Sequence, residues 1–81
     1  METMQSGSSM GYYEGGDFKL LSFAFNPAYT YVPRFGMYLQ CASDYCYPLA
    51  YVRQISETGV TLLVRNENSM GAEITVCWAA E

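Results

Sequence analysis

From residue 18 onward, apolar and polar side chains alternate along short runs separated by turn-forming residues. The runs span residues 18–25, 34–41, 49–55, 60–65 and 72–79. A period of two is typical of a β-strand, whereas an amphipathic helix needs apolar residues at intervals of three and four. No stretch of the chain sustains that helical interval. The pattern therefore predicts an all-β protein, an antiparallel β-sandwich of five to six short strands.

Several of these runs are apolar on both faces, notably at Leu20-Leu21 and near the C-terminus. An antiparallel sheet with one wet face should alternate cleanly. Charged residues make up only 15% of the chain, against a usual share of about 25%, so few charges are available to cover the surface. We therefore expect contacts with other copies of the chain. The alternative is that β-propensity alone explains the extra apolar residues.

The last run is the predicted contact surface between copies. We predict a homo-oligomer, with a trimer favoured, and place its interface at Cys77, Trp78 and Ala79. The side chains of Cys77 and Ala79 are small, so another chain can approach closely there. Trp78 is most simply a core or an interface residue, on the same face of its run as Ile74 and Val76, whereas a sugar-stacking role would need it exposed at a groove.

Residues 1–17 differ in composition from the remainder of the chain. They contain four Gly and three Ser but no Val, Ile or Leu. Such a composition is typical of a flexible segment. We therefore predict a flexible lead or linker over residues 1–17, joined to a β-sandwich domain over residues 18–81.

The charged and nucleophilic residues exclude several classes of function. The net charge is −4, and the four cations Lys19, Arg34, Arg53 and Arg65 are well separated, so a nucleic-acid footprint is not expected. The absence of His removes His-activated nucleophiles and His-ligated zinc. No apolar run is long enough to span a membrane as a helix. We expect no enzyme activity, no cofactor, no metal and no membrane insertion.

Three cysteines are present, Cys41, Cys46 and Cys77. An odd number cannot form a closed set of disulfides within one chain. The favoured interpretation is three reduced thiols that act as small apolar side chains. A bridge between Cys41 and Cys46 across a hairpin loop is the alternative, and it requires an oxidising compartment.

Two polar loops are candidate ligand-binding sites. The residues concerned are Asp44, Tyr45, Tyr47, Arg65, Asn66 and Asn68. Together they offer aromatic faces and hydrogen-bonding groups, the mixture that a sugar ring requires. Two strands separate the loops, and an even number of crossings returns the chain to the same end of a sandwich. The alternative is a pair of ordinary connections, with the tyrosines folded onto the sandwich edge and a solvated hairpin loop at residues 65–68.

The order of features over residues 23–80 resembles a known pattern. The matching pieces are Phe23-Ala24-Phe25, the segment from Tyr29 to Pro33-Arg34-Phe35, Ile55-Ser56-Glu57-Thr58-Gly59-Val60-Thr61-Leu62, and Ile74-Thr75-Val76-Cys77-Trp78-Ala79-Ala80. This order is similar to that of the C-terminal β-sandwich modules of bacteriophage tail fibres and tail-tip proteins, which resemble the H-type lectins. Val60 stands where the pattern usually has Phe.

This resemblance implies a six-stranded sandwich that forms trimers and binds sugar in loops near subunit interfaces. We therefore expect a non-enzymatic structural or host-attachment module, a tail or fibre tip that binds a surface glycan or a host surface protein. The expected location is the virion, assembled in the host cytoplasm. The alternatives are a free-standing small carbohydrate-binding lectin and a small acidic inhibitor of a host protein.

Overall fold

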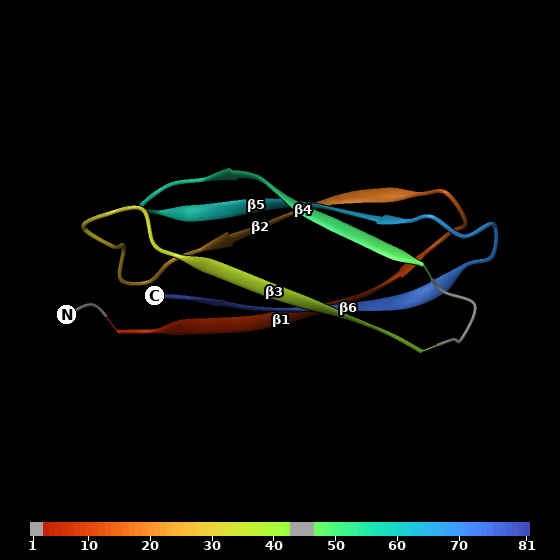
Figure 1. Cartoon of the computed structure of the whole chain (residues 1–81), viewed down its shortest axis with the longest axis horizontal. Helices are drawn as coiled ribbons and strands as arrows, with labels where there is room; N and C mark the ends of the chain where they lie inside the picture. Colours follow the sequence, from red (N-terminus) through yellow and green to blue (C-terminus); the bar gives the residue numbers. More distant parts are fainter. Residues whose placement is uncertain (1–2, 43–46) are drawn as a thin grey trace.

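The computed structural model describes residues 3–42 and 47–81, which form two three-stranded antiparallel sheets packed face to face (Figure 1). The six strands are β1 (Gln5–Tyr13), β2 (Phe18–Ala24), β3 (Phe35–Cys41), β4 (Pro48–Ile55), β5 (Gly59–Asn66) and β6 (Ala72–Ala80). One sheet has the order β1-β6-β3 and the other has the order β2-β5-β4. The predicted all-β antiparallel sandwich is confirmed.

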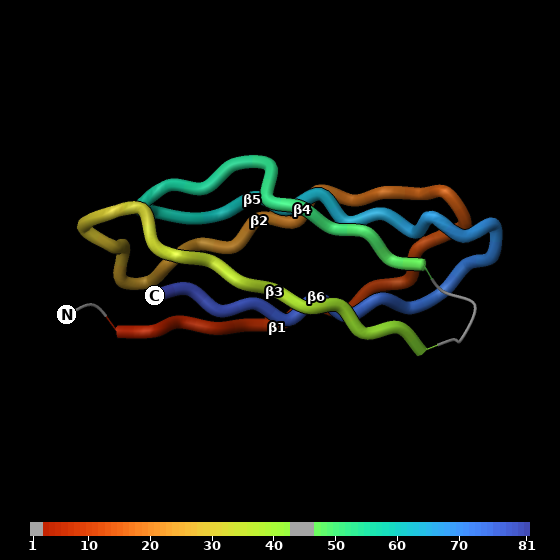
Figure 2. The backbone as a smooth tube through the Cα atoms, in the orientation of Figure 1, coloured from red at the N-terminus to blue at the C-terminus, as the bar shows by residue number. Residues whose placement is uncertain are grey.

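The sandwich is long and narrow, with extents of 43 × 18 × 15 Å. The β1–β2 and β5–β6 connections lie at one end, and the β2–β3 and β4–β5 connections lie at the other, together with the C-terminus (Figure 2). Tyr47 belongs to the first end, because its carbonyl accepts a hydrogen bond of 2.9 Å from the Glu67 amide. Each strand therefore runs most of the length of the molecule and separates two distinct ends.

The core lies between the two central strands, β5 and β6. Their alternation is clean, and every second side chain is buried against the opposite sheet. The core residues are Tyr13, Phe25, Tyr29, Val60, Leu62, Val64, Ile74, Val76, Trp78 and Ala80. The alternation expected in the runs at residues 60–65 and 72–79 is thus present, with Val60, Leu62 and Val64 of β5 and Ile74, Val76 and Trp78 of β6 on the buried faces.

Trp78 belongs to the core and is only 8% exposed. Its ring contacts those of Phe23, Phe25 and Phe35, with centroids 5.4, 5.9 and 5.8 Å away. Of the two places predicted for Trp78, the structure shows the core, and a contribution of Trp78 to an oligomer interface stays a prediction. Cys77 and Ala79 point to the opposite, outer face of β6, and their role as an interface stays a prediction.

The description of residues 1–17 as a flexible lead is wrong for Gln5–Tyr13, which form β1 and pair with β6 along their whole length. Two inner positions of β1 are glycines because other side chains occupy the space there. A Cβ on Gly7 would lie 2.9 Å from the Trp78 indole, and one on Gly11 would lie 3.2 Å from the Lys19 ammonium. Whether a further domain adjoins this end stays a prediction.

The expectation of three reduced thiols is wrong for Cys41, which takes part in a disulfide. Cys77 is a free thiol on the outer face of β6. Cys46, the partner considered in the alternative, lies outside the described residues.

Candidate functional site

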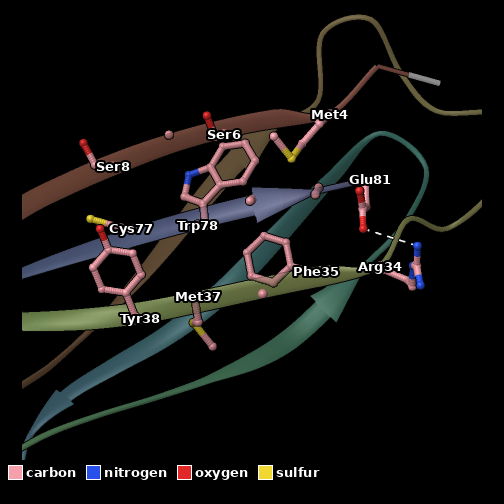
Figure 3. A pocket seen from close by; sticks show the side chains of 14 residues that line it. Met4, Ser6, Ser8, Arg34, Phe35, Met37, Tyr38, Cys77, Trp78 and Glu81 are labelled. Atoms are coloured by element: carbon pink, nitrogen blue, oxygen red, sulfur yellow. Dashed lines mark hydrogen bonds and ion pairs between the residues drawn. The ribbon is translucent and has the colours of Figure 1, made fainter.

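The outer face of the β1-β6-β3 sheet contains an open hollow of about 870 Å³ (Figure 3). The outward-pointing residues that line it are Ser6 and Ser8 of β1, Gly36 and Tyr38 of β3, and Cys77 and Ala79 of β6. We refer to this region as the β6 hollow, since β6 forms its floor. Its volume is within the range of pockets that bind small ligands.

The hollow exists because small side chains meet across three adjacent strands. Ser6, Ala79 and Gly36 form one cross-strand row. A Cβ on Gly36 would meet no other atom within 4 Å, so space is open above this row. In the next row Cys77 faces Tyr38, which is 60% exposed and forms a wall. The hollow therefore has a small-residue floor beside an exposed aromatic ring.

The polar groups of the β6 hollow are hydroxyls, one thiol and an ion pair. A hydrogen bond with the Cys77 thiol, followed by that group's charge and by burial, raises the pKa of the Tyr38 hydroxyl above 10.0. At the end of β6, Arg34 and Glu81 form an exposed pair, with Nη2 and Oε1 3.2 Å apart (Figure 3). The Tyr38 hydroxyl stays protonated at neutral pH, so it can donate a hydrogen bond as well as accept one.

The predicted ligand-binding loops are only partly described. Asp44 and Tyr45 lie outside the described residues. Tyr47 is well exposed, and its bond to the Glu67 amide confirms that residues 47 and 67 lie at the same end of the sandwich. Arg65 Nε lies 3.4 Å from Glu67 Oε1.

Asn66 is fully buried, which removes it from the predicted ligand-binding residues. Its Nδ2 donates to the carbonyls of Tyr13 at 3.3 Å and Met70 at 2.8 Å, and its Oδ1 accepts from the Asn68 amide at 3.0 Å. The side chain satisfies three backbone groups in two segments at this end of the molecule, the end of β1 and the β5–β6 connection. Asn66 therefore holds the end together, whereas Tyr47, Arg65 and Asn68 remain candidates for ligand contact.

The outer face of the second sheet is different in character. Five large apolar residues occupy neighbouring positions on β2, β5 and β4. They are Phe18, Leu20, Leu63, Leu49 and Tyr51, and we refer to them as the apolar patch. All except Leu63, which is partly covered, are about half exposed. The other half of this face is polar, and it includes a hydrogen bond of 3.1 Å between the Ser22 and Thr61 hydroxyls.

Two further findings concern the described part of the chain. No helix there is long and apolar enough to cross a membrane. Residues 3–42 and 47–81 also contain no group of three or more Cys, Asp or Glu side chains arranged to hold a metal ion.

The sequence alone does not indicate the β6 hollow, because the hollow arises from strand pairing. Ser6, Gly36 and Ala79 are unremarkable in sequence, and they share a surface only because β6 pairs with β1 and β3. The outward position of Cys77 and Ala79 on the last run was the one available signal.

Comparison with known proteins shows a likeness in fold. No model of a protein family matches the chain, and no curated protein matches it in sequence. Among solved structures it is similar to the tailspike gp61 of Pseudomonas phage phi297, with a TM-score of 0.71 and 12% identity. The match covers 95% of this chain and 15% of the tailspike. The chain therefore shares the fold of part of a phage tailspike, while the expected likeness to H-type lectins stays a prediction.

Proposed function

We propose that this chain is an attachment-type structural module of a bacteriophage tail and acts as part of the virion. The observation that carries the proposal is the likeness of fold, over 95% of the chain, to part of a phage tailspike. A small all-β module with few charged residues is suited to a place within a larger particle, because neighbouring chains can cover its apolar outer surface.

The module acts as an oligomer, and a trimer is the favoured form. Exposed large apolar side chains on the outer face of the β2-β5-β4 sheet support this, among them Leu20 and Tyr51. A soluble monomer of this size gains little from displaying so many large apolar groups on flat sheet faces.

The ligand of the module is a surface glycan or a surface protein of the host, and the β6 hollow supports the glycan. Tyr38 offers an exposed aromatic face, while Ser6, Ser8 and the Arg34–Glu81 pair offer donors and acceptors around it. A sugar ring, with one apolar face and a rim of hydroxyls, requires this combination. The cluster of Tyr47, Arg65 and Asn68 at the far end of the molecule is the second candidate.

The module binds without catalysis. The chain contains no His, and its nucleophilic groups therefore lack the base that most often activates them. Glycoside hydrolysis would require two carboxyl groups on either side of a glycosidic bond. At the β6 hollow Glu81 is paired with Arg34, and no second acidic residue lines the described hollow.

Two measurements test the proposal. The test of the virion role uses phage particles produced by the genome that encodes the chain. Mass spectrometry of the purified particles should detect the chain. A fluorescently labelled chain should bind bacterial surface polysaccharides and whole cells saturably, without releasing new reducing ends. Tyr38→Ala should weaken glycan binding about tenfold or more, while Met10→Ala, an equally exposed position on the same sheet outside the hollow, should leave it unchanged.

Absence of the chain from purified particles would reject the virion role. Binding that is lost in Tyr47→Ala but intact in Tyr38→Ala would move the ligand site to the far end of the molecule. Release of reducing ends that depends on one acidic residue would overturn the non-enzymatic part of the proposal.

A further inference from the structure

The outer face of the β2-β5-β4 sheet carries the apolar patch in two adjacent cross-strand rows. Phe18, Arg65 and Leu49 form the first row, and Leu20, Leu63 and Tyr51 form the second. We infer that this face is the surface through which copies of the chain associate, with the apolar patch of every copy turned toward the axis that the copies share. This inference rests on the proposed function, in which the chain forms an oligomer, and it names the surface at which the copies meet.

The size of the patch fits an interface between two copies. Phe18, Leu20, Leu49 and Tyr51 are 54%, 51%, 47% and 49% exposed. At roughly 200 Å² for a fully exposed large side chain, they leave about 400 Å² of apolar surface in contact with water. An interface of ordinary size takes about 800 Å² from each partner, of which slightly more than half is apolar. The patch therefore supplies about the apolar share that one partner needs.

The two rows of the patch can be buried without leaving an unpaired charge, because the exposed Arg53 of β4 lies outside both rows, at the register shift between Val52 and Gln54. The strands β2, β5 and β4 contain no Asp or Glu, so no unpaired carboxylate would be buried with the patch. Arg65 lies within the first row, but its guanidinium is already paired with Glu67 at 3.4 Å. The polar half of the face, with Ser22 and Thr61, resembles the polar rim that surrounds an apolar interface centre.

The edges of the same sheet are unsuited to pairing with another chain, so association through this sheet uses its face. β4 begins at Pro48, and its register shifts between Val52 and Gln54. Proline and bulges both interrupt an edge. On β2, the core-facing Lys19 donates to the Tyr12 carbonyl at 2.8 Å. An inward-pointing lysine on an edge strand keeps further strands from adding to it.

Sedimentation analysis of matched surface variants tests the inference. Leu20→Lys places a charge at the centre of the patch, where no acidic residue of the sheet can neutralise it. Tyr51→Lys places a charge in the same cross-strand row, but on β4. It is the second test variant if Leu20→Lys fails to fold. Tyr38→Lys is the control, because Tyr38 is exposed to a similar degree on the opposite sheet. Circular dichroism and the fluorescence of Trp78 report on folding.

At micromolar concentration we expect the wild-type chain and Tyr38→Lys to sediment at a multiple of 9.1 kDa, and Leu20→Lys and Tyr51→Lys to sediment as 9.1 kDa monomers. A wild-type monomer would overturn both this inference and the oligomeric part of the proposed function. An oligomer that persists in both patch variants would overturn the inference alone. Dissociation by Tyr38→Lys, alone or together with the patch variants, would place the β1-β6-β3 face in the interface and overturn the assignment of the interface to the apolar patch.

Discussion

Replacement of Asn66 with aspartate tests whether the side-chain hydrogen bonds of Asn66 stabilise this end of the sandwich. The two side chains have nearly the same shape, but a carboxylate cannot donate to the carbonyls of Tyr13 and Met70, which the amide bonds at 3.3 and 2.8 Å. Two lost hydrogen bonds cost about 1 kcal/mol each, and burial of a charge at a fully buried position adds to this. We expect Asn66→Asp to lower the free energy of unfolding by at least about 3 kcal/mol at pH 7.

The loss should depend on pH in a defined direction. Burial and the two carbonyls favour the neutral carboxyl, so the pKa of the new Asp should be higher in the folded chain than its unfolded value of about 3.9. The folded state then binds more protons than the unfolded state, and stability relative to wild type falls as the pH rises through and above about 4. At pH 3 both states are protonated, a neutral carboxyl can donate one of the two bonds, and the deficit should shrink to about 1 kcal/mol.

Urea unfolding followed by the fluorescence of Trp78, the single tryptophan, measures these differences. All proteins are compared at one concentration, because association contributes to stability. Asn68→Asp is the control, since Asn68 Oδ1 only accepts a bond of 2.7 Å from the Ser69 amide, which a carboxylate can also do. Its stability should stay within about 0.5 kcal/mol of wild type. A loss below about 1 kcal/mol at pH 7 for Asn66→Asp, or an equal loss at pH 3, would refute the reasoning.

Two further predictions concern the β1-β6-β3 sheet. Gly7→Ala should destabilise the chain by about 1–3 kcal/mol in the same unfolding assay, because its Cβ would lie 2.9 Å from the Trp78 indole. Gly36→Ala, whose Cβ would meet open space, should change stability by no more than about 0.5 kcal/mol, and equal effects of the two would contradict this packing. Cys77→Ala should lower the pKa of Tyr38 toward 10.0. Ultraviolet titration against Tyr38→Phe measures this shift, and an unchanged pKa would show that the thiol is not its cause.

The sequence predicts the fold correctly where the alternation of apolar and polar residues within one strand is enough to show which side chains are buried. Val60, Leu62 and Val64 alternate with residues on the outer face of β5, and the structure buries all three. Such strands lie at the centre of their sheets and face a core of uniform character, so the hydrophobic effect acts on every second residue. The alternation is then visible without knowledge of the neighbouring strands.

The sequence does not indicate β1, because Tyr13 is the only large apolar residue on the inner face of this strand. The space inside the sandwich at Gly7 and Gly11 is filled by the Trp78 indole and by Lys19. The burial at these two positions is real, but the atoms that fill the space belong to other strands, and most of β1 has the composition of a flexible Ser- and Gly-containing segment. Asn66 was misread for a related reason. An Asn in a loop is usually solvated, and only the approach of the Tyr13 and Met70 carbonyls gives this one a buried role.

Cross-strand register also explains why two segments with similar apolar sequences have different outer surfaces. Leu20-Leu21 and Cys77–Ala79 both indicated strands that are apolar on two faces. Leu20 pairs into a row of large side chains with Leu63 and Tyr51, which makes a raised apolar surface. Ala79 pairs into a row with Ser6 and Gly36, which makes a hollow. Apolar character along one strand therefore predicts that an outer face is unusual, while the neighbouring strands decide whether it becomes a surface for another copy or a space for a ligand.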